Sequence, residues 1–265
     1  MDEELVSRAA ERLVTAAEEG RPCEPVRDLI GPADQESAYA VQRLVAAQRT
    51  RGGARPCGRK VGLTSKAVQA QLGVDQPDFG VLFEDMIHVG GSEIPADRVL
   101  QPRVEAELAF MLEHDLVEGP LDAEQVRRAT AYVVPALEVC GSRITGWNIS
   151  FADTVADNAS SGAVVVGEDA FRIDQVSTVD LAMSMSVDGV KVSAGTGRDC
   201  LGDPVLAVAW LAQISRGIGA PLRAGELVMS GALGPMFPLT PGARVTATFP
   251  DLGTVAMRLG EGNTT

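Results

Sequence analysis

The stretch QPRVEAELAF, residues 101–110, sets two glutamates into a run of apolar side chains. Successive side chains of a β-strand point to opposite faces, so the apolar residues at even positions in 104–110 share one face of an extended chain. Glu105 and Glu107 then share the other face, with their Cα atoms about 6.5–7 Å apart at a rise of about 3.3 Å per residue. The stretch therefore predicts a strand with one apolar face and two carboxylates that can converge on one ion.

Two interpretations of this glutamate pair remain open on the pattern alone. Alternating glutamates are typical of the solvent-facing side of an antiparallel strand, and that arrangement needs no ion. Glu138 weakens this interpretation, because it lies in the apolar run VVPALEVC, residues 133–140, where an unpaired charge is costly. Three carboxylates without a nearby histidine would suit a hard divalent ion, Mg²⁺ or Mn²⁺, better than zinc.

The pattern of apolar residues along the chain changes near residue 80. Before it, apolar residues at helical spacing predict amphipathic helices, and after it short runs of Val, Leu and Ile between Gly, Pro and Asp predict strands and turns. The C-terminal segments GELVMSGAL, GARVTATF and GTVAMRL predict β-hairpins. The predicted helices span residues 3–19, 37–50, 64–73, 122–132 and 203–215, the last with Asp203 as its cap and Pro204 at its first position.

These elements predict an α+β fold. Residues 1–80 form a small helical N-terminal part that carries a substrate-site loop, and residues 81–265 form a strand-rich catalytic part. No Ser/Pro-rich linker separates the two parts, so we expect one compact unit. Strands and helices do not alternate as a doubly wound parallel sheet requires, which argues against that class of fold.

The composition restricts the class of partner. With 36 acidic and 23 basic residues, the 265-residue chain has a formal net charge of −13, which disfavours nucleic acid and anionic membranes. No apolar run approaches the roughly 20 residues of a membrane helix, and the acidic, amphipathic N-terminus is unlike a signal peptide. The four widely spaced cysteines predict reduced thiols that pack in the interior. We therefore expect a cytoplasmic protein that binds a small molecule or another protein.

A second segment of interest is CGRKVGLTSKAVQAQLGVDQPDFG, residues 57–80. Lys60 precedes a turn that contains glycine, and a loop presents Asp78 and Phe79. A single lysine is more often a solvated charge, and Asp, Pro and Gly all favour an ordinary turn. The segment is thus a candidate for substrate binding that the pattern alone does not establish.

A third segment, SFADTVADNASSG at residues 150–162, concentrates short polar side chains that include Ser160 and Ser161. Such groups orient a substrate or cap turns. Other motifs give little evidence of a binding site. GTGRDCLG, residues 195–202, lacks the preceding strand and the glycine spacing of a dinucleotide-binding fingerprint. His88 and His114 lack partners for a catalytic triad, so the sequence does not support serine hydrolase chemistry.

Taken together, five segments resemble a known family. GRKVGLTSKAVQAQLGVDQPDFGVLF, LQPRVEAELAF, PALEVCGSRI, DTVADNASSG and SGALGPM occur in the order found in the 2-oxopent-4-enoate (2-hydroxypenta-2,4-dienoate) hydratases of aromatic meta-cleavage pathways. That group belongs to the fumarylacetoacetate hydrolase family. The resemblance implies a strand-rich, mixed β-roll and a bound Mg²⁺ or Mn²⁺ ion.

The resemblance also implies roles for individual residues. A hydrophobic slot for the hydrocarbon end of the substrate would include Phe79. The implied site comprises Glu105, Glu107 and Glu138 as metal ligands, Lys60 and Asp78 as catalytic residues, and Ser160 and Ser161 as substrate-binding residues.

The activity implied is addition of water to a 2-hydroxy-2,4-dienoate to give a 4-hydroxy-2-oxoacid. Two alternatives stay open: a decarboxylase of 2-oxo-3-hexenedioate (4-oxalocrotonate) and a non-catalytic partner subunit. Related decarboxylases tend to carry Asp where this chain has Gly141, which favours the hydratase. The resemblance further implies a homo-oligomer, a pentamer or decamer, and a pathway aldolase or decarboxylase as a possible protein partner.

Overall fold

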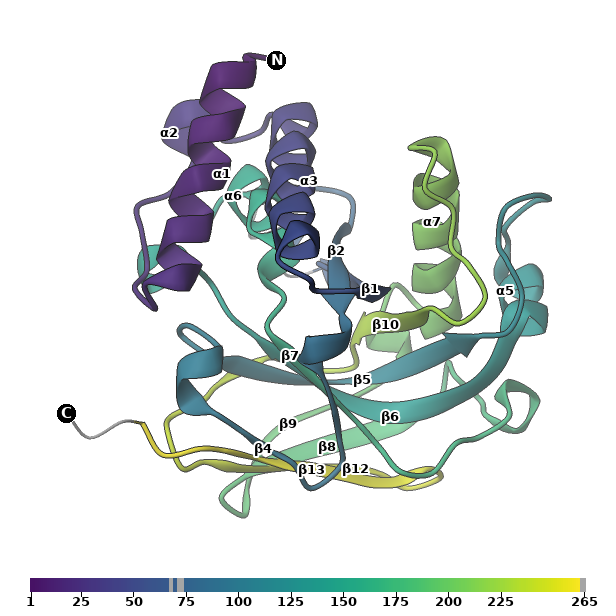
Figure 1. Cartoon of the computed structure of the whole chain (residues 1–265). Helices are drawn as coiled ribbons and strands as arrows, with labels where there is room; N and C mark the ends of the chain where they lie inside the picture. Colours follow the sequence, from purple (N-terminus) through teal and green to yellow (C-terminus); the bar gives the residue numbers. More distant parts are fainter. Residues whose placement is uncertain (67–68, 71–73, 263–265) are drawn as a thin grey trace.

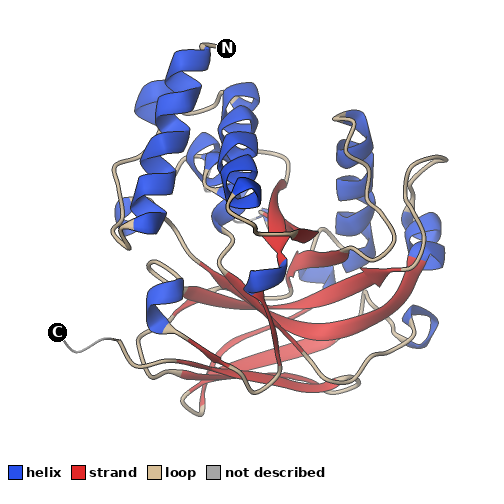
Figure 2. Ribbon diagram, in the orientation of Figure 1, coloured by secondary structure: helices blue, strands red, loops and turns tan. Residues whose placement is uncertain are grey.

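The computed structural model of the chain describes residues 1–66, 69–70 and 74–262. Figures 1 and 2 show three layers, in which most helices lie over one face of a larger β-sheet and a smaller sheet packs against its other face. The helices are α1 (Glu3–Glu18), α2 (Arg27–Ile30), α3 (Gln35–Arg51), α5 (Ala123–Ala129), α6 (Phe151–Ala156) and α7 (Pro204–Gly217). The larger sheet contains β1 (Pro56–Gly62), β2 (Asp78–Phe83), β3 (Ile87–Val89), β5 (Arg103–Leu112), β6 (Thr130–Cys140), β7 (Ala163–Val166), β10 (Leu227–Ala232) and β11 (Phe237–Pro238). The smaller sheet contains β4 (Glu93–Ile94), β8 (Ala182–Val187), β9 (Val190–Thr196), β12 (Arg244–Phe249) and β13 (Gly253–Leu259).

Both sheets have a defined strand order. The larger sheet runs β2-β1-β10-β5-β6-β7-β3, with β11 paired to β5 off this path, and the smaller runs β4-β13-β12-β8-β9. In the larger sheet β1 pairs with β10 and β3 pairs with β7 in parallel, whereas the other pairs are antiparallel. This mixed, strand-rich architecture with a helical N-terminal part confirms the predicted α+β fold class.

The main hydrophobic core lies between the two sheets. The even-numbered residues of β5 from Val104 to Phe110 are fully buried there, together with Ala247 and Phe249 of β12 and Val255 of β13. Full burial of one large apolar side chain is worth about 1.5–3 kcal/mol, so this face contributes strongly to the pairing of the sheets. The apolar face predicted from residues 101–110 is confirmed.

Most predicted helices are present with shifted ends. Helix α1 begins after Asp2, whose side chain caps it, and α7 begins with Pro204 after the Asp203 cap, as predicted. The helix predicted over 122–132 is shorter, because α5 ends at Ala129 and the following β-branched residues pair with β5 instead. The helix predicted over 64–73 falls partly on residues outside the described ranges.

The C-terminal hairpin prediction is correct for one pair of strands only. β12 and β13 form an antiparallel hairpin, but β10 lies in the middle of the larger sheet between β1 and β5. Residues 227–231 are buried in succession, which is typical of a strand that is covered on both faces. A central position therefore replaces the hairpin expected for GELVMSGAL.

The N-terminal segment contributes to both the helical layer and the larger sheet. Helices α1, α3 and α6 share a small hydrophobic cluster that includes Leu13, Val41 and Val155. Residues 56–62 instead form β1, which lies between β2 and β10. No helix in the described ranges is both long and apolar enough to cross a membrane.

Substitution of Gly58 tests how tightly strands β1 and β10 of the larger sheet are packed. A Cβ at this position would lie 2.0 Å from the carbonyl oxygen of Leu227 in the paired strand β10. We expect Gly58→Ala to lower the free energy of unfolding by about 1–3 kcal/mol, measured by urea denaturation. Gly217→Ala is the control, since a Cβ there meets no atom within 4 Å, and a helix favours alanine over glycine by up to about 1 kcal/mol. Equal midpoints for the two variants would contradict the close packing.

Candidate active site

The three predicted glutamates come together across the central strand pair. Glu105 of β5 lies directly opposite Glu138 of β6, and Glu107 lies two pairs further along, opposite Ala136. Glu107 and Glu138 are 0% exposed, whereas Glu105 is partly exposed. The solvent-face interpretation of the pair is therefore wrong, and access from solvent is on the side of Glu105.

Lys60 provides a positive charge inside this cluster. Its Nζ atom lies 3.3 Å from Oε2 of Glu138, and both side chains are buried. Burial by itself lowers the pKa of the Lys60 ammonium, but the charges of Glu138 and Asp78 help to outweigh this and hold that pKa well above its usual value. Lys60 is thus a fixed, buried cation and not a solvated one.

Asp78 lies at the start of β2, beside Lys60. Gly62 pairs with Asp78, and a Cβ at 62 would lie 2.2 Å from Asp78 Oδ1 and 3.3 Å from Lys60 Nζ. Thr154 donates a hydrogen bond from Oγ1 to Asp78 Oδ2 at 3.4 Å. Burial raises the pKa of Asp78, and the Lys60 ammonium offsets this rise only in part. Glycine at 62 leaves the space in which these two side chains meet.

Phe79 occupies a different environment from its neighbour Asp78. Strand alternation turns it to the opposite face of β2, where its ring stacks on Tyr39 with the ring centres 4.8 Å apart. The side-chain amide of Gln42 donates to the carbonyl groups of Phe79 and Val155 at 2.8 and 2.9 Å. Phe79 thus packs on Tyr39 on the face of β2 opposite Asp78, and its role in substrate binding stays a prediction.

The two predicted serines lie at a strained turn, Ser160 as its last residue and Ser161 directly after it. Asn158, Ala159 and Ser160 have φ values of 55°, 49° and 54°, the left-handed region that costs about 1–2 kcal/mol for a non-glycine residue. Ser160 Oγ lies 3.3 Å from Thr154 Oγ1, which connects it to Asp78. The Ser161 hydroxyl is buried and has no hydrogen-bond partner among the described residues.

Two side chains, those of Asn158 and Arg143, hold this turn against the site. The Asn158 side chain bonds both the N–H and the carbonyl group of Val81, at 2.8 and 2.9 Å. On its other side, Arg143 pairs with the buried Asp157 and donates to the Ser161 carbonyl at 2.8 Å. Gly80 permits the close approach, because a Cβ there would lie 2.3 Å from the Asn158 carbonyl oxygen. The turn is therefore fixed from both sides.

Sequence reasoning left these supporting residues without a role. The polar run at 150–162 does contain caps, since Ser150 and Asp153 form a capping box at the start of α6. Asp153 also pairs with Arg27, whereas Thr154 carries the contact to Asp78. The capping residues at the start of α6 are a signal that the sequence itself contains. The contact of this helix with Asp78 is not, because Thr154 and Asp78 are 76 positions apart in the sequence.

The electrostatics of the glutamates differ from those of exposed carboxylates. Burial raises the pKa of Glu107 well above its usual value, and the charges of Glu138 and Glu105 raise it further. Burial raises the pKa of Glu138 to about 7, although Lys60 lowers it in part. Glu107 Oε1 and Glu138 Oε1 are buried and find no hydrogen-bond partner in the described part of the chain. A bound cation would satisfy both atoms, so the donor set fits a hard divalent ion.

Cys140, read from the sequence as a packing residue, lies in the same cluster. Its Sγ is 3.6 Å from Glu105 Oε1, and Glu105, Glu138 and Cys140 each offer one atom within 4.8 Å of the others. Glu107 is not in that compact group, and its Oε2 accepts a hydrogen bond from the Gly231 N–H at 2.8 Å. Burial raises the pKa of the Cys140 thiol. Its two-residue spacing from Glu138 on a strand was the signal for a shared face.

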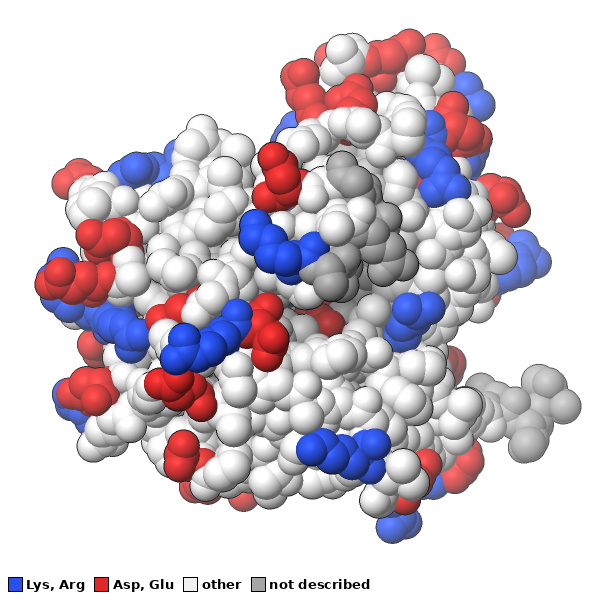
Figure 3. Space-filling view, turned by 180° about the vertical axis from the view of Figure 1, so that it is seen from behind, with Lys and Arg blue, Asp and Glu red and all other residues white. Residues whose placement is uncertain are grey.

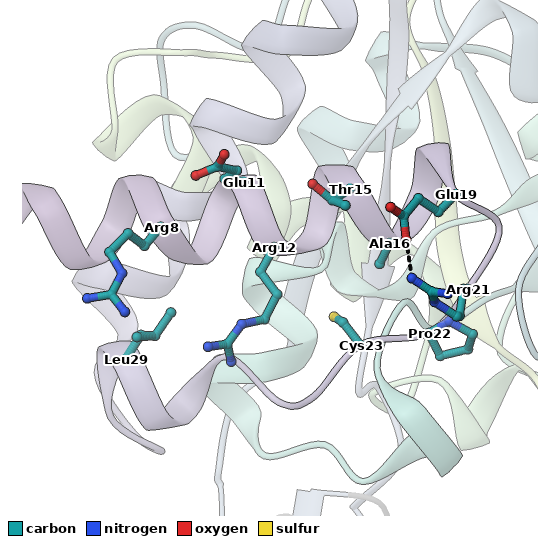
Figure 4. Close-up of a pocket in the computed structure, with 10 residues that line it drawn as sticks. All are labelled: Arg8, Glu11, Arg12, Thr15, Ala16, Glu19, Arg21, Pro22, Cys23 and Leu29. Atoms are coloured by element: carbon teal, nitrogen blue, oxygen red, sulfur yellow. Dashed lines mark hydrogen bonds and ion pairs between the residues drawn. The ribbon is translucent and has the colours of Figure 1, made fainter.

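The surface has two hollows of interest. Figure 3 shows a recess near the centre of the face seen there, with acidic atoms at its floor. A groove between α1 and the segment after it, drawn in Figure 4, involves other residues, and two of its arginines are already paired: Arg12 with Asp28 and Arg21 with Glu19. Since the predicted site residues do not line this groove, it is separate from the carboxylate cluster.

Comparison with known proteins identifies the family. Residues 57–259 match the family described as fumarylacetoacetate (FAA) hydrolase C-terminal. The chain belongs to the fumarylacetoacetate hydrolase family. Within this family it is 48% identical over 250 residues to the TodF product hydratase of Pseudomonas putida F1, covering 94% of this chain and 93% of that protein. It is also 48% identical over 248 residues to 2-keto-4-pentenoate hydratase 2 of Dechloromonas aromatica, covering 94% and 95%.

A solved structure shares the whole fold. The 4-oxalocrotonate decarboxylase of Pseudomonas putida G7, in complex with magnesium and adipate, superposes with a TM-score of 0.93. It is 29% identical, and the match covers 98% of both chains. The resemblance to the fumarylacetoacetate hydrolase family and to its hydratases, inferred from five segments, is confirmed.

The raised carboxyl pKa values predict how the metal-free protein responds to pH. A folded state that binds a carboxyl proton more tightly than the unfolded chain loses stability as pH rises, here from the ordinary value of 4.5 to about 7 for Glu138. We expect the free energy of unfolding in EDTA to fall across this interval, and to fall less in Glu107→Gln, which removes one of the repelling charges. Urea denaturation at several pH values measures it. The exposed Glu113→Gln should follow the wild type, and identical curves for all three proteins would contradict the assignment.

Proposed function

We propose that the protein is a metal-dependent hydratase that adds water to a 2-hydroxy-2,4-dienoate, the enol of 2-oxopent-4-enoate, and forms a 4-hydroxy-2-oxoacid. The observation that carries this proposal is the cluster of three glutamates, two of them fully buried, with Lys60 and Asp78, in a chain 48% identical to named 2-keto-4-pentenoate hydratases. A proton donor beside a carboxylate-rich cation site is what protonation and hydration of a dienol require.

The proposed metal ligands are Glu105, Glu107 and Glu138. With Asp78 they provide four carboxylates against the one ammonium of Lys60, so three negative charges are uncompensated within the cluster when all are ionised. The buried oxygens of Glu107 and Glu138 that find no hydrogen-bond partner among the described residues support a site for Mg²⁺ or Mn²⁺. When bound, such an ion supplies Lewis-acid stabilisation of the charge that develops on the substrate 2-oxygen.

Asp78 is the proposed general acid and base. Its raised pKa keeps the protonated form more populated near neutral pH than in an ordinary aspartate, so Asp78 can hold a proton for C5 of the dienol. After that transfer the carboxylate can accept a proton from the water that adds at C4. The hydrogen bond from Thr154 fixes Oδ2, which leaves Oδ1, without a partner among described residues, for the substrate.

Lys60 and the two serines have the proposed role of binding and orientation. The fixed Lys60 ammonium attracts the substrate carboxylate and stabilises negative charge near Glu138. Ser161 offers a buried hydroxyl with no partner in the described ranges, and the rigid turn before it sets its direction. Exclusion of water by the buried walls strengthens each of these interactions.

Decarboxylation of a 2-oxo-3-hexenedioate is the second candidate. It is favoured by the close superposition on 4-oxalocrotonate decarboxylase, whereas the hydratases are more similar in sequence, at 48% against 29% identity. The same site would stabilise the same enolate charge, so the geometry fits both reactions. Release of carbon dioxide from the dicarboxylate substrate distinguishes them. A non-catalytic subunit is disfavoured, because all five charged groups are present and adjoin one another.

Asp78→Asn tests the acid and base role. We expect kcat for loss of the dienoate absorbance to fall by about 10²–10⁴-fold, because asparagine cannot exchange the proton, while KM changes little. Asp174→Asn is the control, since Asp174 is exposed and pairs with Arg172 on the surface. Full turnover by the Asp78 variant would remove this residue from the mechanism.

Removal of the metal tests the carboxylate site. EDTA is expected to abolish turnover, and added Mg²⁺ or Mn²⁺ is expected to restore it and to raise the melting temperature of the wild type. In Glu107→Gln we expect both effects to be lost, whereas Glu113→Gln should keep them. Activity that survives EDTA and the Glu107 substitution would end the metal proposal.

Assembly and location stay predictions. A pentamer or decamer, a pathway aldolase or decarboxylase partner and a cytoplasmic location are expected from the family resemblance and the composition. Sedimentation of the purified protein measures the number of subunits in the assembly.

A further inference from the structure

Two residues flank the opposed pair Glu105 and Glu138 on the same face of the larger sheet. Glu107 lies beyond the pair in one direction, opposite Ala136, and Cys140 lies beyond it in the other direction, in register with Arg103. The opposed pair therefore has an oxygen ligand on one side and a sulfur ligand on the other. The mechanism above uses the oxygen side only.

The sulfur side has the contacts of a ligand set. Cys140 is 3% exposed, its Sγ lies 3.6 Å from Glu105 Oε1, and one atom of each of Glu105, Glu138 and Cys140 lies within 4.8 Å of the others. Glu138 is fully buried, and neither of its carboxylate oxygens makes a hydrogen bond among the described residues. A thiol alone would be packing, but beside it Glu138 Oε1 is buried without a partner, and the Glu105 carboxylate forms no ion pair within the described residues, because the one nearby ammonium, Lys60, lies at Glu138 Oε2. A buried carboxylate oxygen without a partner is costly, and a cation on this side would satisfy it.

The nearest basic residue in register does not occupy this side. Arg103 pairs with Cys140, but its guanidinium carbon lies 4.4 Å from the centre of the Trp147 ring, over the face of the indole. Lys60 approaches Glu138 at 3.3 Å. The charge of Glu105 is thus not neutralised by an ion pair on the Cys140 side within the described structure.

We infer that Glu105, Glu138 and Cys140 form a second ligand set, overlapping the first, that takes a thiophilic divalent cation such as Cd²⁺, Co²⁺ or Zn²⁺. A set of two oxygens and one sulfur suits softer ions, whereas the all-oxygen set with Glu107 suits Mg²⁺ and Mn²⁺. When the soft ion binds, the Cys140 S–H bond breaks, its proton leaves to the buffer, and the sulfur lone pair forms the metal–sulfur bond. The inference rests on the proposed metal-dependent function for the shared pair.

The shared ligands have a functional consequence. Since both sets use Glu105 and Glu138, a soft ion and a hard ion exclude each other. The chain would then bind trace thiophilic metals in competition with its hard ion, and Cys140 would determine that sensitivity. A side chain without sulfur at 140 leaves only the hard-ion set.

Titration of the metal-free full-length protein with Cd²⁺, followed by the ultraviolet sulfur-to-metal charge-transfer absorption, tests the inference directly. We expect a band that saturates at one equivalent in the wild type, in Cys57→Val and in Glu107→Gln. The band should be absent in Cys140→Val, and excess Mg²⁺ should suppress it in the wild type. A silent wild type, or a band that persists in Cys140→Val, would overturn the inference.

A thermal shift with Mg²⁺ separates this result from the proposed function. Cys140→Val is expected to keep the Mg²⁺-induced rise in melting temperature, which also shows that the variant folds around an intact hard-ion set. Loss of that rise in Cys140→Val, but not in Cys57→Val, would show that the two sets are not distinct and would overturn the inference. Absence of the rise in the wild type would count against the metal-dependent function itself.

Discussion

The antiparallel pairing of β5 with β6 places two carboxylates, Glu105 and Glu138, directly opposite each other in the interior. Like charges at this separation are unfavourable in a low-dielectric environment, and Glu107 adds a third. One ammonium, from Lys60, lies within 3.3 Å of Glu138. The excess negative charge therefore favours protonated carboxyl groups or a bound cation in the cluster, and the other residues of the site are arranged around it.

The strand register that brings Glu105 and Glu138 together is fixed by the residues on the opposite face of β5. The even residues of β5 fill the core between the two sheets, so a slip by one residue would turn the glutamates toward the smaller sheet and remove Leu108 and Phe110 from the core. Core packing thereby imposes the unfavourable proximity of the carboxylates. The stability of the fold and the reactivity of the site come from two faces of one strand.

Local strain at the turn of residues 158–160 has a similar origin. Left-handed backbone at three successive non-glycine residues persists only where the surroundings over-determine it, and here Arg143 and the amide of Asn158 hold it from two sides. The turn sets Ser160 against Thr154, and Thr154 against Asp78. The strained turn in one segment thus helps to orient Asp78, the proposed general acid and base, in another.

The sequence by itself determined the strand of residues 101–110, its apolar face, the shared face of Glu105 and Glu107 and the two long N-terminal helices, because these depend on local periodicity. It also indicated Lys60 and Asp78 as candidates through the family resemblance. Only the tertiary structure decided that Glu138 lies opposite Glu105, that Cys140 contacts the same cluster and that Phe79 stacks on Tyr39. These facts depend on strand register and on contacts between distant residues, which the periodicity of one segment does not encode.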